Sequence, residues 1–474
     1  MFGQQQVRST RQPGQIGLTM RGLFGWASLL PGQGEVTGAG QHQAHPRRSS
    51  RHRGLRFDDG SASEMPLARL YLRMARSGDT NTTRGCALRH TIVRHPSRMG
   101  AEMRTIAATV ERAGDPWLVQ DLDVSQPKEG EVLVRWSFAG LCLSDEHGRG
   151  GDWDTHLPYV GGHEGAGVVE KVGPGVTRLQ PGDHVAACWI PTCGRCRWCS
   201  TGRTAMCVVG PSSSIGLMAD GGYRFLKDGL GFATFAGVGT FAQRAVLADG
   251  SCVKIDPTIP LELAALASCG VLTGWGSAVR AGHTSPGEVV AVVGVGGVGA
   301  NAVAGAAQAG AAAVIAVDPN PLKHDLAREF GATHTFLTAD DAREAAADLN
   351  PSAGGADLVI FTAASLSADS VRSAFYLAGR CGRIVLSSMA SGPVDLSIPG
   401  MDLVGDEKSL IGASYGSCNP HSDIPLVLSM AMAGRLPLQR LITGRFELED
   451  ITSGYEALAA GAAIRGLIEH RLPS

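Results

Sequence analysis

The chain has 474 residues, a formal net charge of −2, 44% hydrophobic residues and 5% aromatic residues, so two or three ordinary domains are expected. No run of 18 apolar residues is present, which argues against a membrane span. The 11 cysteines come without a signal peptide, which argues against a secreted disulfide framework. We therefore expect a cytoplasmic protein that uses some of its cysteines as metal ligands.

The first 102 residues differ from the rest in charge. They hold 15 Arg, no Lys and 6 acidic residues, a balance of +9, so the remainder carries −11. This segment lacks periodicity and is rich in Gly, Ser, Gln and Arg, so we expect residues 1–102 to be a disordered N-terminal extension. Met103 is favoured as the natural start, although a transit peptide would share this composition. The acidic remainder is a poor nucleic-acid binder, because such binding depends on neutralising phosphates, and neither a nucleic acid nor a membrane is expected as a partner.

From residue 104 to about residue 270, short apolar stretches alternate like strands and are separated by Gly/Pro turns. This pattern predicts an all-β or barrel-like domain. The expected strands include 105–110, 131–137, 165–172 and 184–187.

Four cysteines interrupt this domain in the run CGRCRWC and shortly after it. Four thiolates on one loop can close a tetrahedral metal shell, and zinc is the ion that such a shell favours. A shell closed by four sulfurs has no open position, so this site is predicted to be structural. The four ligands are Cys193, Cys196, Cys199 and Cys207.

Beyond residue 270 the pattern changes to alternating strands and helices. The apolar run 288–293 predicts a buried parallel strand, the Ala-rich segment 300–309 predicts a helix, and 313–318 predicts the next strand. Later strands are expected at 357–361 and 382–387. Such alternation indicates a doubly wound α/β sheet.

A GxGxxG motif lies between the first of these strands and its helix. Gly294 permits a tight turn, Gly296 lets the backbone approach a pyrophosphate, and Gly299 lets the helix pack on the strand. Gly297 and Val298 complete the loop, whose helix N-terminus offers free N–H groups to phosphates. The alternative is a tight turn without a ligand.

Asp318 comes 19 residues after Gly299, at the end of the next strand. A carboxylate there can bind the adenosine ribose hydroxyls and would repel a 2′-phosphate, which favours NAD over NADP. Lys323 is close enough in sequence to reach the same ribose, unless it is an ordinary surface lysine.

Three further residues have metal-ligand chemistry: Cys142, His163 and Cys269. Together they can form a Cys₂His zinc site with an open fourth position. Each one alone is more typical of an ordinary core residue. Their joint occurrence with the glycine motif favours the metal site.

The motifs GLCLSDEH, GGHEGAGVVE, CGRCRWC, SCGVLTGWGSAV, GVGGVG and AVD resemble those of zinc-containing medium-chain alcohol dehydrogenases, from about Met103 to the end. The resemblance implies a GroES-like β-rich catalytic domain, a Rossmann domain for NAD, and a homodimer or homotetramer. The implied boundaries are 103–270 for the catalytic domain with its zinc lobe at 193–207, 271–413 for the Rossmann domain, and 414–474 for a return to the catalytic domain.

The same resemblance implies roles for the residues around a catalytic zinc ion. Glu164 would lie close to the metal, and Asp145 would orient the ring of the ligand His163. Ser144 and His147 match the proton-relay positions, through which the alcohol proton would reach solvent.

Two positions concern the cofactor pyrophosphate. Leu143 stands where many relatives carry Arg or His, and Arg465 matches the pyrophosphate arginine of the family. The alternative for Arg465 is a surface salt bridge.

The implied activity is zinc- and NAD-dependent oxidation of alcohols to aldehydes or ketones by reversible hydride transfer. One alternative is a thiol-dependent formaldehyde dehydrogenase that acts on an S-hydroxymethyl adduct. An alternative of another class is a zinc-ribbon interaction module. The chain is also similar to the branch described as NDMA-dependent alcohol dehydrogenases, some of which keep NAD bound through turnover.

Overall fold

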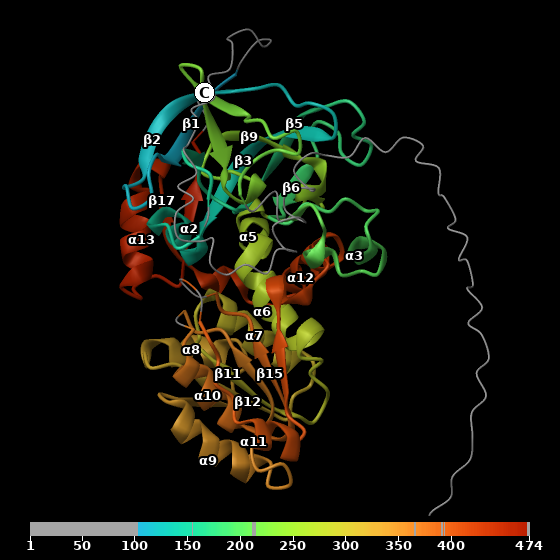
Figure 1. The fold of residues 1–474 in the computed structure, drawn as a ribbon, viewed down its shortest axis with the longest axis vertical. Coiled ribbons are helices and arrows are strands. Elements are labelled where there is room, and N and C mark those ends of the chain that lie inside the picture. Colours follow the sequence, from blue (N-terminus) through green and yellow to red (C-terminus); the bar gives the residue numbers. More distant parts are fainter. Residues whose placement is uncertain are drawn as a thin grey trace, which may run out of the picture. The chain divides into compact units, whose positions relative to one another are not determined.

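The computed structural model describes residues 103–471 except 154, 211–214, 365, 390–391 and 393. The predicted disordered extension over residues 1–102 lies outside the described residues. Within the described part of the chain the strands form three sheets (Figure 1).

The first sheet is a closed barrel, which begins where the described chain begins. Its β1 pairs with β2 on one side and, through Thr109 and Val110, with β4 on the other, which closes the barrel. Successive side chains of β1 point to opposite faces and belong to two different hydrophobic clusters. Ala107 belongs to the same cluster as Val124, and Ala108 to the same cluster as Tyr159. The strands, in barrel order, are β1 (Met103–Val110), β2 (Leu118–Val124), β7 (Phe225–Lys227), β8 (Leu230–Thr234) and β4 (Tyr159–Val160).

The second sheet is built around β3 (Glu131–Leu141), which pairs with β5, β9 and β18. The strand predicted to end at Ser137 continues to Leu141, since β5 and β18 still flank it there. The C-terminal strands thus join a sheet begun some 300 residues earlier; the predicted domain boundaries themselves stay predictions. The other strands are β5 (Glu164–Val172), β6 (His184–Ala187), β9 (Arg244–Ala248), β10 (Cys252–Lys254), β17 (Ile442–Phe446) and β18 (Arg465–Glu469).

The third sheet is entirely parallel and has the order β13-β12-β11-β14-β15-β16. This is the strand order of the doubly wound dinucleotide-binding fold. From β11 the chain first adds β12 and β13 on one side and then β14, β15 and β16 on the other, so β11 lies at the topological switch point. The predicted doubly wound sheet is therefore confirmed. Its strands are β11 (Val289–Val293), β12 (Ala313–Val317), β13 (His334–Phe336), β14 (Ala356–Phe361), β15 (Ala378–Leu386) and β16 (Ser409–Gly412).

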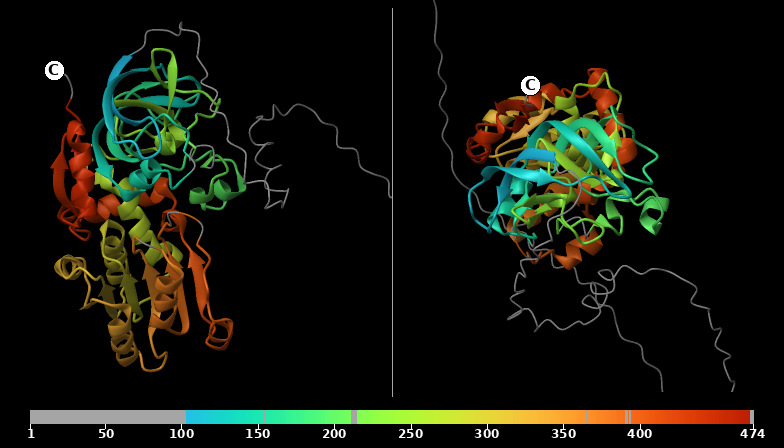
Figure 2. Two further views of the ribbon diagram at one scale, coloured as in Figure 1. Left: turned by 60° about the vertical axis from the view of Figure 1, so that its left-hand side comes forward. Right: turned by 90° about the horizontal axis from the view of Figure 1, so that it is seen from above.

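Both faces of β11 are covered, as its uninterrupted apolar sequence predicts. Val290 and Val292 pack with α6 and α7 residues, whereas Val289 and Ala291 pack with residues of α9 and α10. Figures 1 and 2 show helices on both faces of this sheet. The helices are α7 (Gly297–Gln308), α8 (Leu322–Glu329), α9 (Ala339–Leu349), α10 (Ala368–Leu377) and α11 (Gly400–Gly405).

One helical stretch, Leu261–Ala281, contacts the second sheet and also α7, a helix that packs on the third sheet. Its first part, α5 (Leu261–Leu266), packs on β3 and β5, and its later part, α6 (Leu272–Gly276), packs on α7. Among the described helices it alone has the length and apolarity of a membrane span, but 83% of its most apolar window is buried in the protein, as in a core helix. The remaining helices are α2 (Leu143–Gly150), α3 (Arg197–Ser200), α12 (Pro420–Met432) and α13 (Ile451–Ala459).

Candidate active site

Cys142 and His163 meet because β3 and β5 are antiparallel neighbours. Gly140, near the end of β3, pairs with Glu164, the first residue of β5. Cys142 follows β3 as the N-cap of α2, and His163 immediately precedes β5. Two residues that are 21 positions apart in the chain are thus placed side by side by strand pairing.

Cys269 reaches the same place from the core helix. It lies in a π-helical turn, Ala267–Val271, between α5 and α6. Such turns are rare and occur often at functional sites. The donor atoms of Cys142, His163, Glu164 and Cys269 all lie within 4.8 Å of one another. The structure therefore brings together the three predicted ligands and places Glu164 with them.

Asp145 holds the His163 ring from the first turn of α2. Nδ1 of His163 lies 3.1 Å from each carboxylate oxygen, and one of these oxygens also accepts the backbone N–H of Gly162 at 3.1 Å. Because a carboxylate only accepts, Nδ1 is the donor, so that in the neutral imidazole Nε2 carries the lone pair that can bind a metal ion. Burial raises the pKa of Asp145, and His163 opposes this rise. The predicted orienting contact is thus present.

Glu164 is buried against Arg465, a contact that the sequence did not predict. The Arg465 guanidinium donates to Oε2, and the backbone N–H of Gly270 donates to Oε1 at 3.2 Å. A Cβ atom on Gly140 would lie 2.2 Å from Oε2, so the carboxylate needs a glycine at that point of β3. Burial raises the pKa of Glu164 to about 7, although Arg465 opposes this. The two partners are 301 positions apart, and no local pattern signals their pairing.

The two thiols of this site influence each other. A hydrogen bond from Cys269 lowers the pKa of Cys142 well below its usual value against the effect of burial, and His163 acts in the same direction. The same bond, together with burial, raises the pKa of Cys269. The thiolate is the form of cysteine that binds metal ions. The site therefore favours a thiolate at Cys142.

This donor set fits zinc. Sulfur and imidazole ligands suit Zn²⁺, and two cysteines with one histidine leave a fourth position for water or substrate. Glu164 is the only carboxylate in this ligand group, and its charge is already paired with Arg465.

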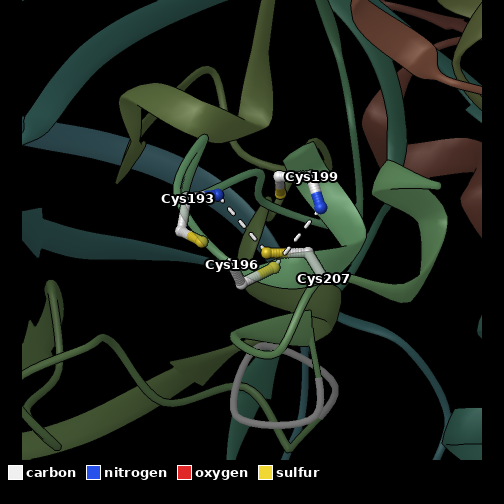
Figure 3. A group of neighbouring side chains, drawn as sticks. All are labelled: Cys193, Cys196, Cys199 and Cys207. Carbon is white, nitrogen blue, oxygen red and sulfur yellow. Dashed lines mark hydrogen bonds between the residues drawn. The ribbon is translucent and has the colours of Figure 1, made fainter. Parts of the chain in front are cut away.

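The four predicted structural ligands also gather, on the loop around α3. The sulfurs of Cys193, Cys196, Cys199 and Cys207 lie within 4.8 Å of one another and turn toward one another in Figure 3. Backbone N–H groups of Cys193 and Cys199 point at the sulfurs of Cys207 and Cys196, at 3.3 and 3.5 Å. Backbone hydrogen bonds from Cys199 and Val208, together with the neighbouring thiols, lower the pKa of Cys196 to about 6. Four sulfurs this close can close a tetrahedral shell, which suits a structural zinc ion.

The glycine loop has the geometry that a dinucleotide needs. Gly294 has a φ of 92°, and a Cβ on Gly299 would lie 1.8 Å from the Gly294 oxygen. Gly296 faces open space, because a Cβ added there would have no atom within 4 Å, and α7 begins beside it at Gly297 and Val298. No side chain caps this helix. Its free N–H groups and positive dipole end therefore suit a pyrophosphate.

Asp318 follows β12 and is 3% exposed. Its Oδ2 accepts the backbone N–H of Val295 at 2.8 Å, and its Oδ1 accepts that of Asn320 at 2.9 Å. The Lys323 ammonium lies 3.3 Å from Oδ2. The structure thus brings Asp318 and Lys323 together, and it gives Asp318 a further contact, to the glycine loop, which the motif alone does not signal.

Arg465 lies beside the start of α7, where the pyrophosphate arginine was predicted. A Cβ on Gly297 would lie 2.4 Å from Cδ of Arg465, so the stem of this side chain runs along the glycine loop. Its guanidinium is paired with Glu164, and the residue is 6% exposed. Arg465 does form a salt bridge, but the pair is buried, so the alternative of a surface salt bridge is wrong.

Ser144 and His147 lie three residues apart on α2, which puts both on one face of the helix. Both are partly buried, and Nδ1 of His147 lies 2.6 Å from Oδ2 of Asp152. Their roles in proton transfer stay predictions.

Comparison with known families assigns two regions of the chain. The family of the alcohol dehydrogenase GroES-like domain matches residues 128–257, and that of the zinc-binding dehydrogenase matches residues 297–433. The GroES-like part of the predicted fold is thereby confirmed.

Among individual proteins, an NDMA-dependent alcohol dehydrogenase of Amycolatopsis methanolica is 44% identical over 370 residues, which cover 78% of this chain and 99% of the relative. An alcohol dehydrogenase B of Mycobacterium tuberculosis is 39% identical over 373 residues, with 78% and 99% covered. The crystal structure of a benzyl alcohol dehydrogenase of Acinetobacter calcoaceticus matches with a TM-score of 0.73 and 27% identity over 78% of this chain and 100% of that chain. The chain belongs to the zinc-containing medium-chain alcohol dehydrogenases.

Proposed function

We propose that the chain oxidises alcohols reversibly, with NAD as the hydride acceptor, at the site formed by Cys142, His163 and Cys269. The observation that supports this most directly is the position of Arg465. Its guanidinium contacts Glu164 in the ligand group, and its stem runs along Gly297 at the glycine loop. The site for the alcohol and the site for the cofactor are therefore adjacent.

The residues have distinct tasks in this proposal. Cys142, Cys269 and Nε2 of His163 would hold zinc, a Lewis acid that makes the alcohol oxygen more acidic. Asp145 fixes the tautomer of His163. The Ser144 hydroxyl and His147 would carry the alcohol proton toward solvent, so that bulk water need not enter.

The cofactor is proposed to be NAD rather than NADP. The Asp318 carboxylate is buried at the end of β12, next to the glycine loop, and would face the 2′ position of the adenosine ribose. A phosphate there would meet a negative charge with little solvent to screen it.

The similarity to the NDMA-dependent enzyme of Amycolatopsis methanolica supports a further proposal, that NAD stays bound through turnover. Leu143, 40% exposed at the start of α2, offers no charge to a pyrophosphate, so retention would depend on the glycine loop and Arg465. NAD that survives gel filtration would support this, whereas cofactor-free protein would contradict it.

The formaldehyde alternative is less well supported than alcohol oxidation. An S-(hydroxymethyl)glutathione dehydrogenase of Synechocystis is 35% identical over 372 residues, compared with 44% for the NDMA-dependent relative. Family membership also favours an enzyme over a zinc-ribbon interaction module. Absence of turnover with simple alcohols, but turnover with formaldehyde and a thiol, would reverse this preference.

Metal and cofactor analysis tests the proposal. We expect two zinc ions per chain, one in each ligand group, and NAD-dependent oxidation of at least one alcohol in a panel. The variant Cys142→Ser should retain one zinc ion and lose activity by more than about a hundredfold, because Lewis-acid catalysis contributes several kcal/mol. Cys381→Ser, at an exposed cysteine, is the matched control and should behave as wild type. Full activity in Cys142→Ser, or a single zinc ion in the wild type, would contradict the assignment.

We also propose a cytoplasmic homo-oligomer. Among the described residues β16 pairs only with β15, which leaves its other edge open. Leu410 on β16 is 37% exposed, and Met401 and Val404 on α11 are 83% and 73% exposed. Open edges with exposed apolar side chains favour association with another chain.

A further inference from the structure

The C-terminal end of α2 places an acidic residue over a predicted relay residue. Gly151 has a φ of 84° and ends the helix in the left-handed region. Its N–H donates to the Gly148 oxygen at 3.2 Å, and the N–H of Asp152 donates to the His147 oxygen at 3.0 Å. These are the two hydrogen bonds of a Schellman turn. In this turn the backbone folds back, so that Asp152 lies next to His147, whose carbonyl it binds.

In such turns these two residues frequently make an apolar contact. Here they make a polar one, because Oδ2 of Asp152 lies 2.6 Å from Nδ1 of His147. Trp153 stacks on the other side of the imidazole, with ring centroids 5.5 Å apart and an interplanar angle of 29°. The His147 ring is therefore held by a carboxylate and by an aromatic face.

We propose that Asp152 is a positioning residue for His147, an inference that rests on the proposed relay. The Asp152 carboxylate can only accept a hydrogen bond, so Nδ1 of His147 carries the proton. In the neutral imidazole the lone pair is then on Nε2, and in the proposed relay this nitrogen would receive the proton from the alcohol. One turn of backbone, Gly148–Asp152, thus sets both the orientation and the tautomer of the relay base.

A purely structural role predicts something different. The His147 and Asp152 side chains are 24% and 34% exposed, and exposed pairs of this kind add little to stability. A pair that serves only to end the helix would affect thermal stability slightly and leave proton transfer unchanged. The proposal instead requires an effect on the tautomer and on turnover.

Nitrogen-15 NMR of the histidine-labelled full chain at pH 8 reads the tautomer directly, with His147→Gln used to assign the signals. We expect a protonated Nδ1 and an unprotonated Nε2 at His147 in the wild type. Asp152→Ala should move the proton toward Nε2, and Asp152→Glu should restore the original pattern. A wild-type His147 protonated at Nε2 would overturn the proposal, as would a pattern that Asp152→Ala leaves unchanged.

Kinetics then tests the connection to turnover. Asp152→Ala should lower kcat for alcohol oxidation by about tenfold, while KM changes by less than about twofold. A tenfold loss is a fraction of the rate enhancement that a general acid or base typically contributes. Asp152→Glu should recover most of the loss. In a His147→Gln background Asp152→Ala should have no further effect, because the residue acts through His147.

The matched control is Asp249→Ala, which removes a carboxylate of similar exposure, 30%, that pairs with Arg178. It should leave kcat unchanged. The proposal would be overturned if Asp152→Ala still lowered kcat in the His147→Gln background. It would also be overturned if Asp152→Ala alone had the kcat of the wild type. If the wild type oxidises no alcohol, the proposed function fails, and the NMR result alone decides whether Asp152 positions His147.

Discussion

Asp318 shows how one buried side chain can serve two parts of a site. It is placed to face the cofactor ribose, and it also accepts the backbone N–H of Val295 inside the glycine loop. The loop is therefore fastened to the end of β12 by the residue that would recognise the ribose. Loss of this carboxylate should affect both the shape of the loop and the contact with the cofactor.

Asp318→Ala is expected to weaken NAD binding by about tenfold or more, since hydrogen bonds to charged groups contribute about 1.5–3 kcal/mol. NADP binding should weaken less, so the preference for NAD falls. Titration calorimetry with both nucleotides measures the two affinities. Asp325→Ala, on the exposed face of α8, is the control and should bind NAD as the wild type does. An unchanged NAD preference in Asp318→Ala would show that another residue sets it.

Among the elements, β18 joins the most distant parts of the chain. It pairs with β3 through Gly466 and Leu141, delivers Arg465 to the ligand group, and is followed by His470. Nε2 of His470 donates to the Thr240 carbonyl at 2.8 Å. Thr240 belongs to the loop before β9, and its N–H donates to the oxygen of Gly162, the residue before His163, at 3.0 Å. The end of β18 is thus connected through Thr240 to the ligand group.

His470 should make the protein sensitive to mild acid. Burial lowers its pKa from 6.5 to about 4, so below pH 6.5 the unfolded chain binds a proton that the folded chain does not. Stability contributed by the neutral side chain is therefore complete above pH 6.5 and is lost progressively down to about pH 4, about 2 kcal/mol at pH 5.

His470→Gln retains an N–H donor but does not titrate. We expect its urea midpoint to fall less than that of the wild type between pH 7 and pH 5. Since both proteins contain the same cysteine ligand groups, the difference between them isolates His470 from any loss of metal. Equal losses in the two proteins would mean that His470 is protonated in the folded state at pH 5.

For the whole molecule, the open edge of β16 predicts the assembly state. Light scattering should give a mass that is a multiple of the 49.3 kDa chain. Leu410→Lys should shift the protein toward the monomer, because a charge on the edge strand opposes pairing. Leu349→Lys, at a 40% exposed position on α9, is the control and should leave the mass unchanged. A monomeric wild type would contradict the proposed oligomer.

Much of the site could be predicted from the sequence because its chemistry lies in short motifs. The four lobe cysteines lie within one loop, and the glycine motif has its strand and helix directly beside it. The start of α7 was harder to predict. Glycines are poor helix formers, so the sequence indicates a helix from residue 300. The helix instead begins at Gly297, and its first turn includes Gly299, where an added Cβ would meet the Gly294 oxygen.

The remaining features depend on contacts between distant segments. The need for glycine at position 140 appears only once β3 and β5 are paired and Glu164 fills the space beside it. The same holds for the bond between Glu164 and Arg465, and for the π-helical turn that carries Cys269, which no local pattern indicates.

The separation of these segments along the chain also sets the order in which the two groups of metal-ligand residues can be assembled during synthesis. The four-cysteine lobe is complete once residue 207 has left the ribosome, and all its ligands lie within 15 residues. The reactive centre needs Cys269, and its Glu164 stays unpaired until Arg465, close to the end of the chain, has emerged. The four lobe cysteines are therefore all present before Cys269 is made, and the pair between Glu164 and Arg465 is the last of these contacts that can form.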